Sequence, residues 1–177
     1  MKKRSLAIAL VAVMLLVLAA CGGGAPKTPE EVKGETFETD LISALVPNGW
    51  KAFPASDLFD EYEGDNDPTS ISIYKDAKSE LDMFSKPGLT IRYTKPEITM
   101  IPPAADWYED VTELADIKAG SYTWKGFTGV SFDVPVAALY TNETDQFTVN
   151  VTLEASGGKI TLEDPDVLAI LGSIKVK

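Results

Sequence analysis

The chain contains a single cysteine, Cys21, and no histidine. One cysteine cannot form a disulfide within the chain. The absence of histidine removes the usual zinc and copper sites, and also the Ser-His-Asp and Cys-His nucleophile systems. Because no disulfide is possible within the chain, a hydrophobic core has to hold the fold. Because a domain of about 140 residues buries roughly two-thirds of its surface, we expect one self-sufficient domain.

The start of the chain has the pattern of an export signal. Positions 2–4 are basic, positions 6–18 are all apolar, and two alanines precede Cys21. The apolar run is shorter than the roughly 20 residues that a membrane-spanning helix needs. This order of charge, apolar core and small residues predicts a signal peptide over residues 1–20.

The segment Leu18-Ala19-Ala20-Cys21 resembles the lipobox of bacterial lipoproteins. In that family the cysteine receives a diacylglycerol thioether, carries fatty acids such as palmitate, and becomes the first residue of the mature protein. The resemblance implies lipidation at Cys21 and a lipid anchor on the extracytoplasmic face of the cell membrane. The alternative is an ordinary secretory signal or a short anchor helix that contains a cysteine.

The predicted mature chain is strongly acidic. The full chain has 16 basic and 27 acidic residues, and removal of a signal peptide with three basic residues leaves a net charge of −14. Such a chain is repelled by phosphate backbones, which argues against nucleic-acid binding. An anionic lipid surface repels it too, so the acyl chains at Cys21 have to provide the membrane attachment.

A tether is predicted between the lipidated cysteine and the folded domain. Residues 21–35 contain Gly22-Gly23-Gly24, two prolines and several charges, without an apolar face. This composition is typical of a flexible coil. We therefore place the domain at residues 36–177.

Alternating apolar and polar residues predict most of the strands. The clearest cases are 70–75, 89–94 and 147–153, where every second residue is apolar. Further strands are expected around Phe37 and over 41–46, which Pro47-Asn48-Gly49 ends with a turn. Two more, 120–124 and 127–134, are expected on either side of a Lys125-Gly126 hairpin turn, with Val130, Phe132 and Val134 pointing inward.

Three helices are predicted. One covers 76–86, and a second follows Pro102-Pro103 with Trp107, Val111 and Leu114 on one face. The last begins at Asp164 as the N-cap and Pro165 in the first turn, and its expected buried stripe is Val167, Ile170, Leu171 and Ile174. The order of elements predicts an α+β domain, with an antiparallel β-sheet flanked by helices in α/β/α layers.

Two short segments resemble PsbP-like domains, which are named for an extrinsic subunit of photosystem II. Val46-Pro47-Asn48-Gly49-Trp50-Lys51 is similar to the turn near the start of these domains, and Leu171-Gly172-Ser173-Ile174-Lys175 to the end of their last helix. In layout the resemblance covers 37–177. It implies an antiparallel sheet flanked by helices, and it transfers no functional residue.

An acidic stretch provides the only candidate metal site. Six carboxylates lie between Asp57 and Asp67 without a basic residue among them. Oxygen ligands from one flexible segment suit calcium, although the order is not that of an EF-hand. The predicted ligands of a weak calcium site are Asp60, Glu63, Asp65 and Asp67. The alternative is a solvated loop that binds no ion.

Five aromatic residues are candidates either for a ligand groove or for the core. They are Trp50, Trp107, Tyr122, Trp124 and Phe132. Trp107 belongs to the predicted helix stripe and is therefore expected to be buried. Trp124 lies beside the predicted hairpin turn and is expected to be the most exposed of the five.

These features favour a membrane-anchored, outward-facing binding or interaction module without catalytic residues. Its partners would be the membrane, through Cys21, and an envelope protein or a small ligand. Apart from weak calcium, no cofactor is expected. Two alternatives are a histidine-free hydrolase that uses paired carboxylates and a structural partner of a cell-envelope complex.

Overall fold

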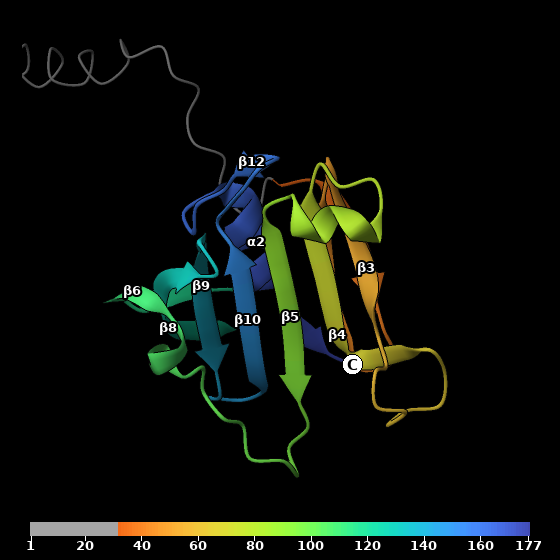
Figure 1. Ribbon diagram of the computed structural model, residues 1–177. Coiled ribbons are helices and arrows are strands. Elements are labelled where there is room, and N and C mark those ends of the chain that lie inside the picture. Colours follow the sequence, from red (N-terminus) through yellow and green to blue (C-terminus); the bar gives the residue numbers. More distant parts are fainter. Residues whose placement is uncertain (1–31) are drawn as a thin grey trace, which may run out of the picture.

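A large antiparallel sheet dominates the computed structural model, which describes residues 32–177 (Figure 1). Its strands lie in the order β3-β4-β5-β10-β9-β8-β6, and β7 also pairs with β8. Their bounds are Trp50–Ser56 (β3), Asn66–Lys75 (β4), Gly88–Thr94 (β5), Glu109–Glu113 (β6), Ile117–Ala119 (β7), Tyr122–Ser131 (β8), Val134–Thr141 (β9) and Gln146–Thr152 (β10).

A smaller layer covers one face of this sheet. It consists of the helix α2 (Pro165–Ser173) and a three-stranded sheet in the order β1-β2-β13. The three strands are Gly34–Glu38 (β1), Ile42–Pro47 (β2) and Lys175–Val176 (β13). In Figure 1 the large sheet is seen with α2 behind it. We call the covered face the inner face and the opposite one the outer face.

The remaining elements are short. The strands Glu154–Ala155 (β11) and Gly158–Lys159 (β12) form a hairpin after β10. Two 3-10 helices, Glu80–Phe84 and Ala105–Trp107, lie in the connections before β5 and before β6.

The inner face of the central strands forms the core. Cross-strand register places Ile71, Ile91, Val149 and Leu139 in one row and Ile73, Leu89, Val151 and Ala137 in the next. All eight side chains are buried, together with Ile42 of β2 and Ile170 of α2. The alternation predicted for 70–75, 89–94 and 147–153 is therefore confirmed.

The predicted last helix is confirmed as well. α2 begins at Pro165 with Asp164 at the N-cap position, and its expected stripe of Val167, Ile170 and Leu171 is buried. The Asp164 side chain does not cap the helix, because it accepts hydrogen bonds from Thr161 in the preceding turn instead.

The predicted α/β/α layering is wrong. Across residues 32–177, strands account for 51% of the residues and helices for 12%, and the one α-helix of this range lies on one face of the sheet, so the fold is β-rich. The predicted helix with Trp107, Val111 and Leu114 is instead a 3-10 turn followed by the edge strand β6. A short isolated helix is marginal in water, whereas this segment gains backbone hydrogen bonds along β8. The segment 76–86 likewise forms only a 3-10 turn.

The predicted Lys125-Gly126 hairpin turn is also wrong, because both residues lie inside the long strand β8. The turn that joins β8 to β9 is Phe132-Asp133, and both residues have positive φ, 50° and 62°. Positive φ at both central positions matches the twist of a two-residue hairpin. Phe132 is consequently 99% exposed instead of pointing inward.

The predicted signal peptide, Cys21 and most of the predicted tether lie outside the described residues. The folded part begins before position 36, since β1 starts at Gly34 and the Asn48 N–H donates to the Lys33 carbonyl at 2.9 Å. Between residues 32 and 177 no helix is long and apolar enough to cross a membrane.

Candidate functional site

The outer face of the large sheet is polar along its central strands. The residues that alternate with the core form rows such as Ser70-Arg92-Thr148-Tyr140 and Ser72-Thr90-Asn150-Ala138. The face seen in Figure 1 has no α-helix in front of it. Hydroxyl, amide and guanidinium groups thus point away from the core, on strands that the core holds rigid.

On the β4 side, the hydroxyl groups of this face bond to one another. The Thr90 hydroxyl lies 3.2 Å from the hydroxyls of both Ser72 and Tyr74, and the Ser70 hydroxyl donates to the Ile91 carbonyl at 3.2 Å. Ser70, Ser72 and Tyr74 are buried. Their hydrogen-bonding capacity is used within the protein, as buried polar groups require.

Arg92 lies at the centre of the outer face and is 65% exposed. Its guanidinium forms one ion pair, at 3.8 Å to Asp67, and makes no hydrogen bond to any residue of the described range 32–177. Asp67 already accepts hydrogen bonds from the Thr69 N–H at 2.8 Å and from the Thr69 hydroxyl at 2.6 Å. Arg92 therefore keeps most of its five donors available for a ligand.

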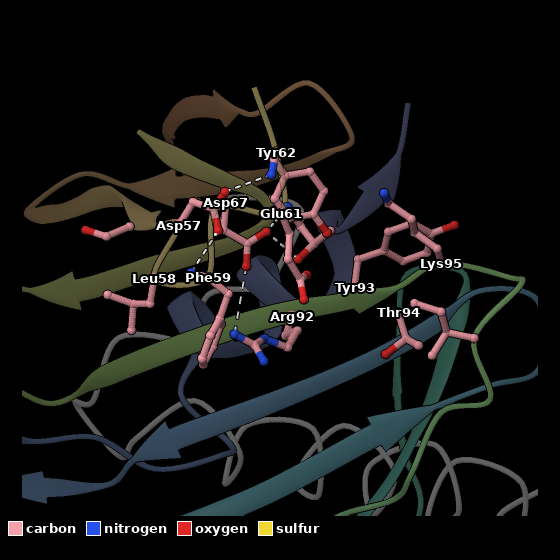
Figure 2. A pocket seen from close by; sticks show the side chains of 13 residues that line it. Asp57, Leu58, Phe59, Glu61, Tyr62, Asp67, Arg92, Tyr93, Thr94 and Lys95 are labelled. Atoms are coloured by element: carbon pink, nitrogen blue, oxygen red, sulfur yellow. Dashed lines mark hydrogen bonds and ion pairs between the residues drawn. The ribbon is translucent and has the colours of Figure 1, made fainter. Parts of the chain in front are cut away.

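An acidic pocket of about 280 Å³ lies on one side of Arg92, beneath the loop that follows β3 (Figure 2). We define this acidic pocket by its three carboxylates, Asp57, Glu61 and Asp67, together with the cations Arg92 and Lys95. Its other lining residues are Ser56, Leu58, Phe59, Tyr62, Thr69, Tyr93, Thr94 and Ile98. The Lys95 ammonium lies 4.7 Å from the centre of the Tyr62 ring, a cation–π distance.

The loop over the acidic pocket is shaped by Asp57. Its carboxylate accepts the backbone N–H groups of Tyr62 at 2.8 Å and Phe59 at 3.3 Å. Partial burial acts to raise the pKa of Asp57, but the backbone hydrogen bonds from Tyr62, Glu61, Phe59 and Asp60 outweigh it and hold the pKa below its usual value. Asp57 is therefore ionised in its structural role.

A second pocket, the central pocket, lies on the other side of Arg92 and has a volume of about 370 Å³. Its lining consists of Thr90, Arg92, Ile101, Pro103, Tyr108, Thr148 and Asn150. Arg92 is the one charged residue among them. Within residues 32–177, the side chains of Thr148, Asn150 and Tyr108 make no hydrogen bonds, so their polar atoms face the pocket or solvent unpaired.

Ile101, Pro103 and the ring of Tyr108 form the apolar wall of the central pocket, and hydrogen bonds and packing hold this wall in place at both ends. The Met100 N–H donates to the Gln146 side chain at 3.0 Å, and the Gln146 amide donates to the carbonyls of Lys95 and Ile98. Tyr108 packs edge-on against Phe127, with ring centres 5.0 Å apart. The segment that carries Ile101 and Pro103 is thus anchored beside the sheet.

The predicted calcium ligands are only partly brought together. Glu63, Asp65 and Asp67 line one shallow hollow with Glu38 and Asp40, whereas Asp60 is not among its lining residues. Among the described residues, no three acidic side chains converge closely enough to hold a metal ion. Asp67 is engaged by Thr69 and Arg92, as described above. The weak calcium site stays a prediction.

The expectations for two of the aromatic residues are reversed in the structure. Trp124 is fully buried in a cluster with Tyr122 and Phe147, while Trp107 is 84% exposed. Trp50 is buried and donates from its indole N–H to Asp166 at 3.0 Å. None of the five candidate aromatics lines the central pocket.

Sequence reasoning missed the residues of the central pocket. Arg92, Thr148 and Asn150 occupy outward positions of strands that were correctly predicted. One signal was present in the sequence, because Arg92 is the only arginine besides Arg4 in the predicted signal peptide. The proximity of Arg92 to Thr148 could not be foreseen, since it depends on the pairing of β5 with β10.

No protein-family model matches the chain, and no curated protein sequence does. A crystal structure of a protein from Bacteroides thetaiotaomicron superposes with a TM-score of 0.41 and 9% sequence identity, over 81% of this chain and 48% of the other. The chain spans about half the length of that protein. A likeness at this level carries no argument about function.

Proposed function

We propose that the protein is a lipid-anchored binding module on the extracytoplasmic face of a bacterial cell membrane, and that its central pocket holds a small ligand. The observation that carries the proposal is the central pocket itself. Thr148 and Asn150 present unpaired polar groups there, next to the exposed guanidinium of Arg92 and beside the anchored apolar wall. A concave site with a few convergent polar groups and apolar walls is the usual form of a small-molecule site.

The anchoring part of the proposal rests on the first 21 residues. The lipobox at Leu18-Ala19-Ala20-Cys21 supplies an acylation site, and a mature chain with a net charge of −14 needs one to stay at an anionic membrane. The folded part starts at about Lys33, so roughly a dozen residues link it to the lipid and hold the pocket close to the membrane.

Binding without catalysis is the better interpretation of these pockets. General acid–base catalysis needs a group that exchanges protons near neutral pH, and the guanidinium of Arg92 does not. In the acidic pocket, the pKa of Asp57 is lowered, whereas a carboxylic acid that donates a proton in hydrolysis needs a raised pKa. No specific observation favours the hydrolase alternative.

The anchor is tested by growing the source bacterium, or a bacterial host, with labelled palmitate. The wild-type chain should take up the label and partition into the detergent phase of an extract, and Cys21→Ala should do neither. A wild-type protein that stays in the aqueous phase without label would contradict the anchor.

Binding is tested by nuclear magnetic resonance on the full chain in a neutral detergent. A panel of small carboxylates, amides, alcohols and amines is titrated, and the backbone amide signals of β5 and β10 are followed. We expect at least one class to shift the signals of Arg92, Thr148 and Asn150 and to leave those of α2 unchanged. If no compound shifts these signals, the pocket is not a binding site.

A further inference from the structure

We infer that the ligand of the central pocket is a small monocarboxylate with an apolar body, and that its carboxylate binds the guanidinium of Arg92. This inference rests on the proposed function and specifies its ligand. The juxtaposition behind it is a single exposed guanidinium beside two unpaired hydrogen-bonding side chains and an apolar wall.

The charge of the pocket selects an anion. Arg92 is the only charged lining residue of the central pocket, in a chain that is acidic overall. A guanidinium presents parallel N–H donors that match the two oxygens of a carboxylate, and such a bidentate pair is among the stronger hydrogen-bonded contacts in proteins. The only partner of Arg92 in residues 32–177, Asp67, lies at 3.8 Å, too far for a hydrogen bond.

The position of Asp67 decides from which side the ligand approaches. An anion entering through the acidic pocket would meet the carboxylates of Asp57, Glu61 and Asp67. An anion in the central pocket meets none. The carboxylate therefore binds on the side of Arg92 that faces β10.

Two side chains of β10 complete the anion site. The cross-strand register pairs Thr148 with Arg92 and Asn150 with Thr90, so the Thr148 hydroxyl and the Asn150 amide lie on the same face as the guanidinium. Both groups can donate to a carboxylate oxygen. Hydrogen bonds from these two side chains are directional, unlike the ionic attraction of Arg92. They therefore favour a planar carboxylate over a spherical halide ion.

One cation also limits the charge of the ligand. A carboxylate brings one negative charge, which Arg92 neutralises. A phosphate group brings nearly two, and in this acidic chain the second would remain uncompensated. The site therefore favours a monocarboxylate over a phosphate.

The apolar wall determines the rest of the ligand. Ile101 is largely exposed, and Pro103 and Tyr108 lie beside it along the pocket. A volume of about 370 Å³ is near the lower end of the range for small-molecule sites. These features fit a short aliphatic or aromatic body, such as those of hexanoate and benzoate.

The experiment follows the side-chain Nε–Hε signal of Arg92 by nuclear magnetic resonance in the full chain. In the unprocessed chain only Arg4 and Arg92 contribute such signals, and Arg4 serves as the internal control; in the predicted mature chain, which begins at Cys21, Arg92 is the only arginine and its signal is unambiguous. The probes are hexanoate and benzoate, the uncharged hexanamide and benzamide, and inorganic phosphate. We expect both carboxylates to shift the Arg92 signal saturably, with the amides and phosphate at least about tenfold weaker.

Three variants refine the test. Arg92→Lys keeps the positive charge but loses the parallel N–H donors of the guanidinium, and it should weaken hexanoate binding roughly tenfold. Thr148→Val should weaken binding severalfold, whereas Thr94→Val in the acidic pocket should not. Lys118→Gln, which removes an exposed cation on β7, is the matched control and should bind like the wild type.

The outcomes separate the ligand class from the proposed function. If the amides shift the β5 and β10 signals as well as the carboxylates do, the monocarboxylate inference is overturned and the binding function stands. Tighter binding of phosphate than of hexanoate would overturn it in the same way. If none of the probes, nor any compound of the wider panel above, shifts these signals, both the inference and the binding function fail.

Discussion

The two faces of the central strands differ in what they contribute to the protein. In the central part of β4, β5 and β10, odd-numbered positions such as Ile71, Ile91 and Val149 are fully buried against α2 and the small sheet. The even-numbered positions, such as Arg92 and Thr148, lie on the outer face, and several of them line the pockets. One alternating sequence therefore encodes the stability of the fold and the candidate site on opposite sides of the same backbone.

Substitutions in the candidate site should therefore leave the stability of the fold nearly unchanged. Side chains of the inner face stabilise the fold because they remove apolar area from water. Exposed side chains of the outer face remove little apolar area from water and therefore stabilise the fold little. Changes on the inner face should therefore lower stability, and changes at exposed outer positions should alter binding alone.

The largest expected effect is at Phe147. Its ring is fully buried and lies 5.2 Å from Tyr93 and 5.6 Å from Tyr122 between ring centres. Phe147→Ala should lower the free energy of unfolding by about 3–5 kcal/mol, as measured by urea denaturation. Thr148→Ala, on the other face of the same strand, is the matched control and should change it by less than about 0.5 kcal/mol. Equal losses would contradict the division between the two faces.

The second effect concerns the contact between α2 and β7. A Cβ on Gly120 would lie 2.0 Å from the carbonyl oxygen of Gly172, and Gly120 has a φ of +60°. Gly120→Ala should therefore cost about 2–4 kcal/mol, because it adds a clash to the strain of positive φ.

Gly49→Ala is the control for that clash. Gly49 also has a positive φ, of +89°, but nothing lies within 4 Å of its added Cβ, so only the backbone strain of about 1–2 kcal/mol should appear. If both variants lose the same free energy, the helix does not press against β7 as closely as described.

The third effect depends on pH. Tyr122 is buried in the core, and its hydroxyl donates to Asp145. Burial, followed by that hydrogen bond, raises the pKa of Tyr122 above its usual value near 10. Because the folded-state pKa is raised, the stabilisation is fully present below pH 10 and is lost as the pH rises beyond it. The loss should be at most about 1.4 kcal/mol per pH unit.

Urea denaturation at a series of pH values should show this decline, and Tyr122→Phe should flatten it. An equally steep decline in the variant would assign the effect to other residues.

The smallest expected effect on stability is at Arg92, on the outer face. Arg92→Gln removes an exposed side chain whose ion pair with Asp67 is long, and should change the free energy of unfolding by less than about 0.5 kcal/mol. Thermal unfolding measures the change. A loss above 1 kcal/mol would mean that Arg92 serves the fold and is not available for a ligand.

The predictions from sequence succeeded where the signal was local and repeated. The apolar residues of 89–94 and 147–153 alternate without interruption, and α2 has both its proline start and its apolar stripe. They failed where three apolar residues were taken for a helix face. The spacing of Trp107, Val111 and Leu114 is a weak signal for a helix, because it consists of three residues only. The edge of β8 was open to pairing, and the backbone of 109–113 forms a strand along it.

The candidate site shows the same limit. The acidic residues were visible as a group because they are contiguous in sequence, whereas the residues of the central pocket come from β5, β10 and the segment before β6. The sequence by itself determined that Arg92 and Thr94 point away from the core, because side chains alternate along a strand. Only the tertiary structure decided that Thr148 lies beside Arg92 and that Tyr108 closes the pocket, because strand pairing joins segments that are distant in the chain.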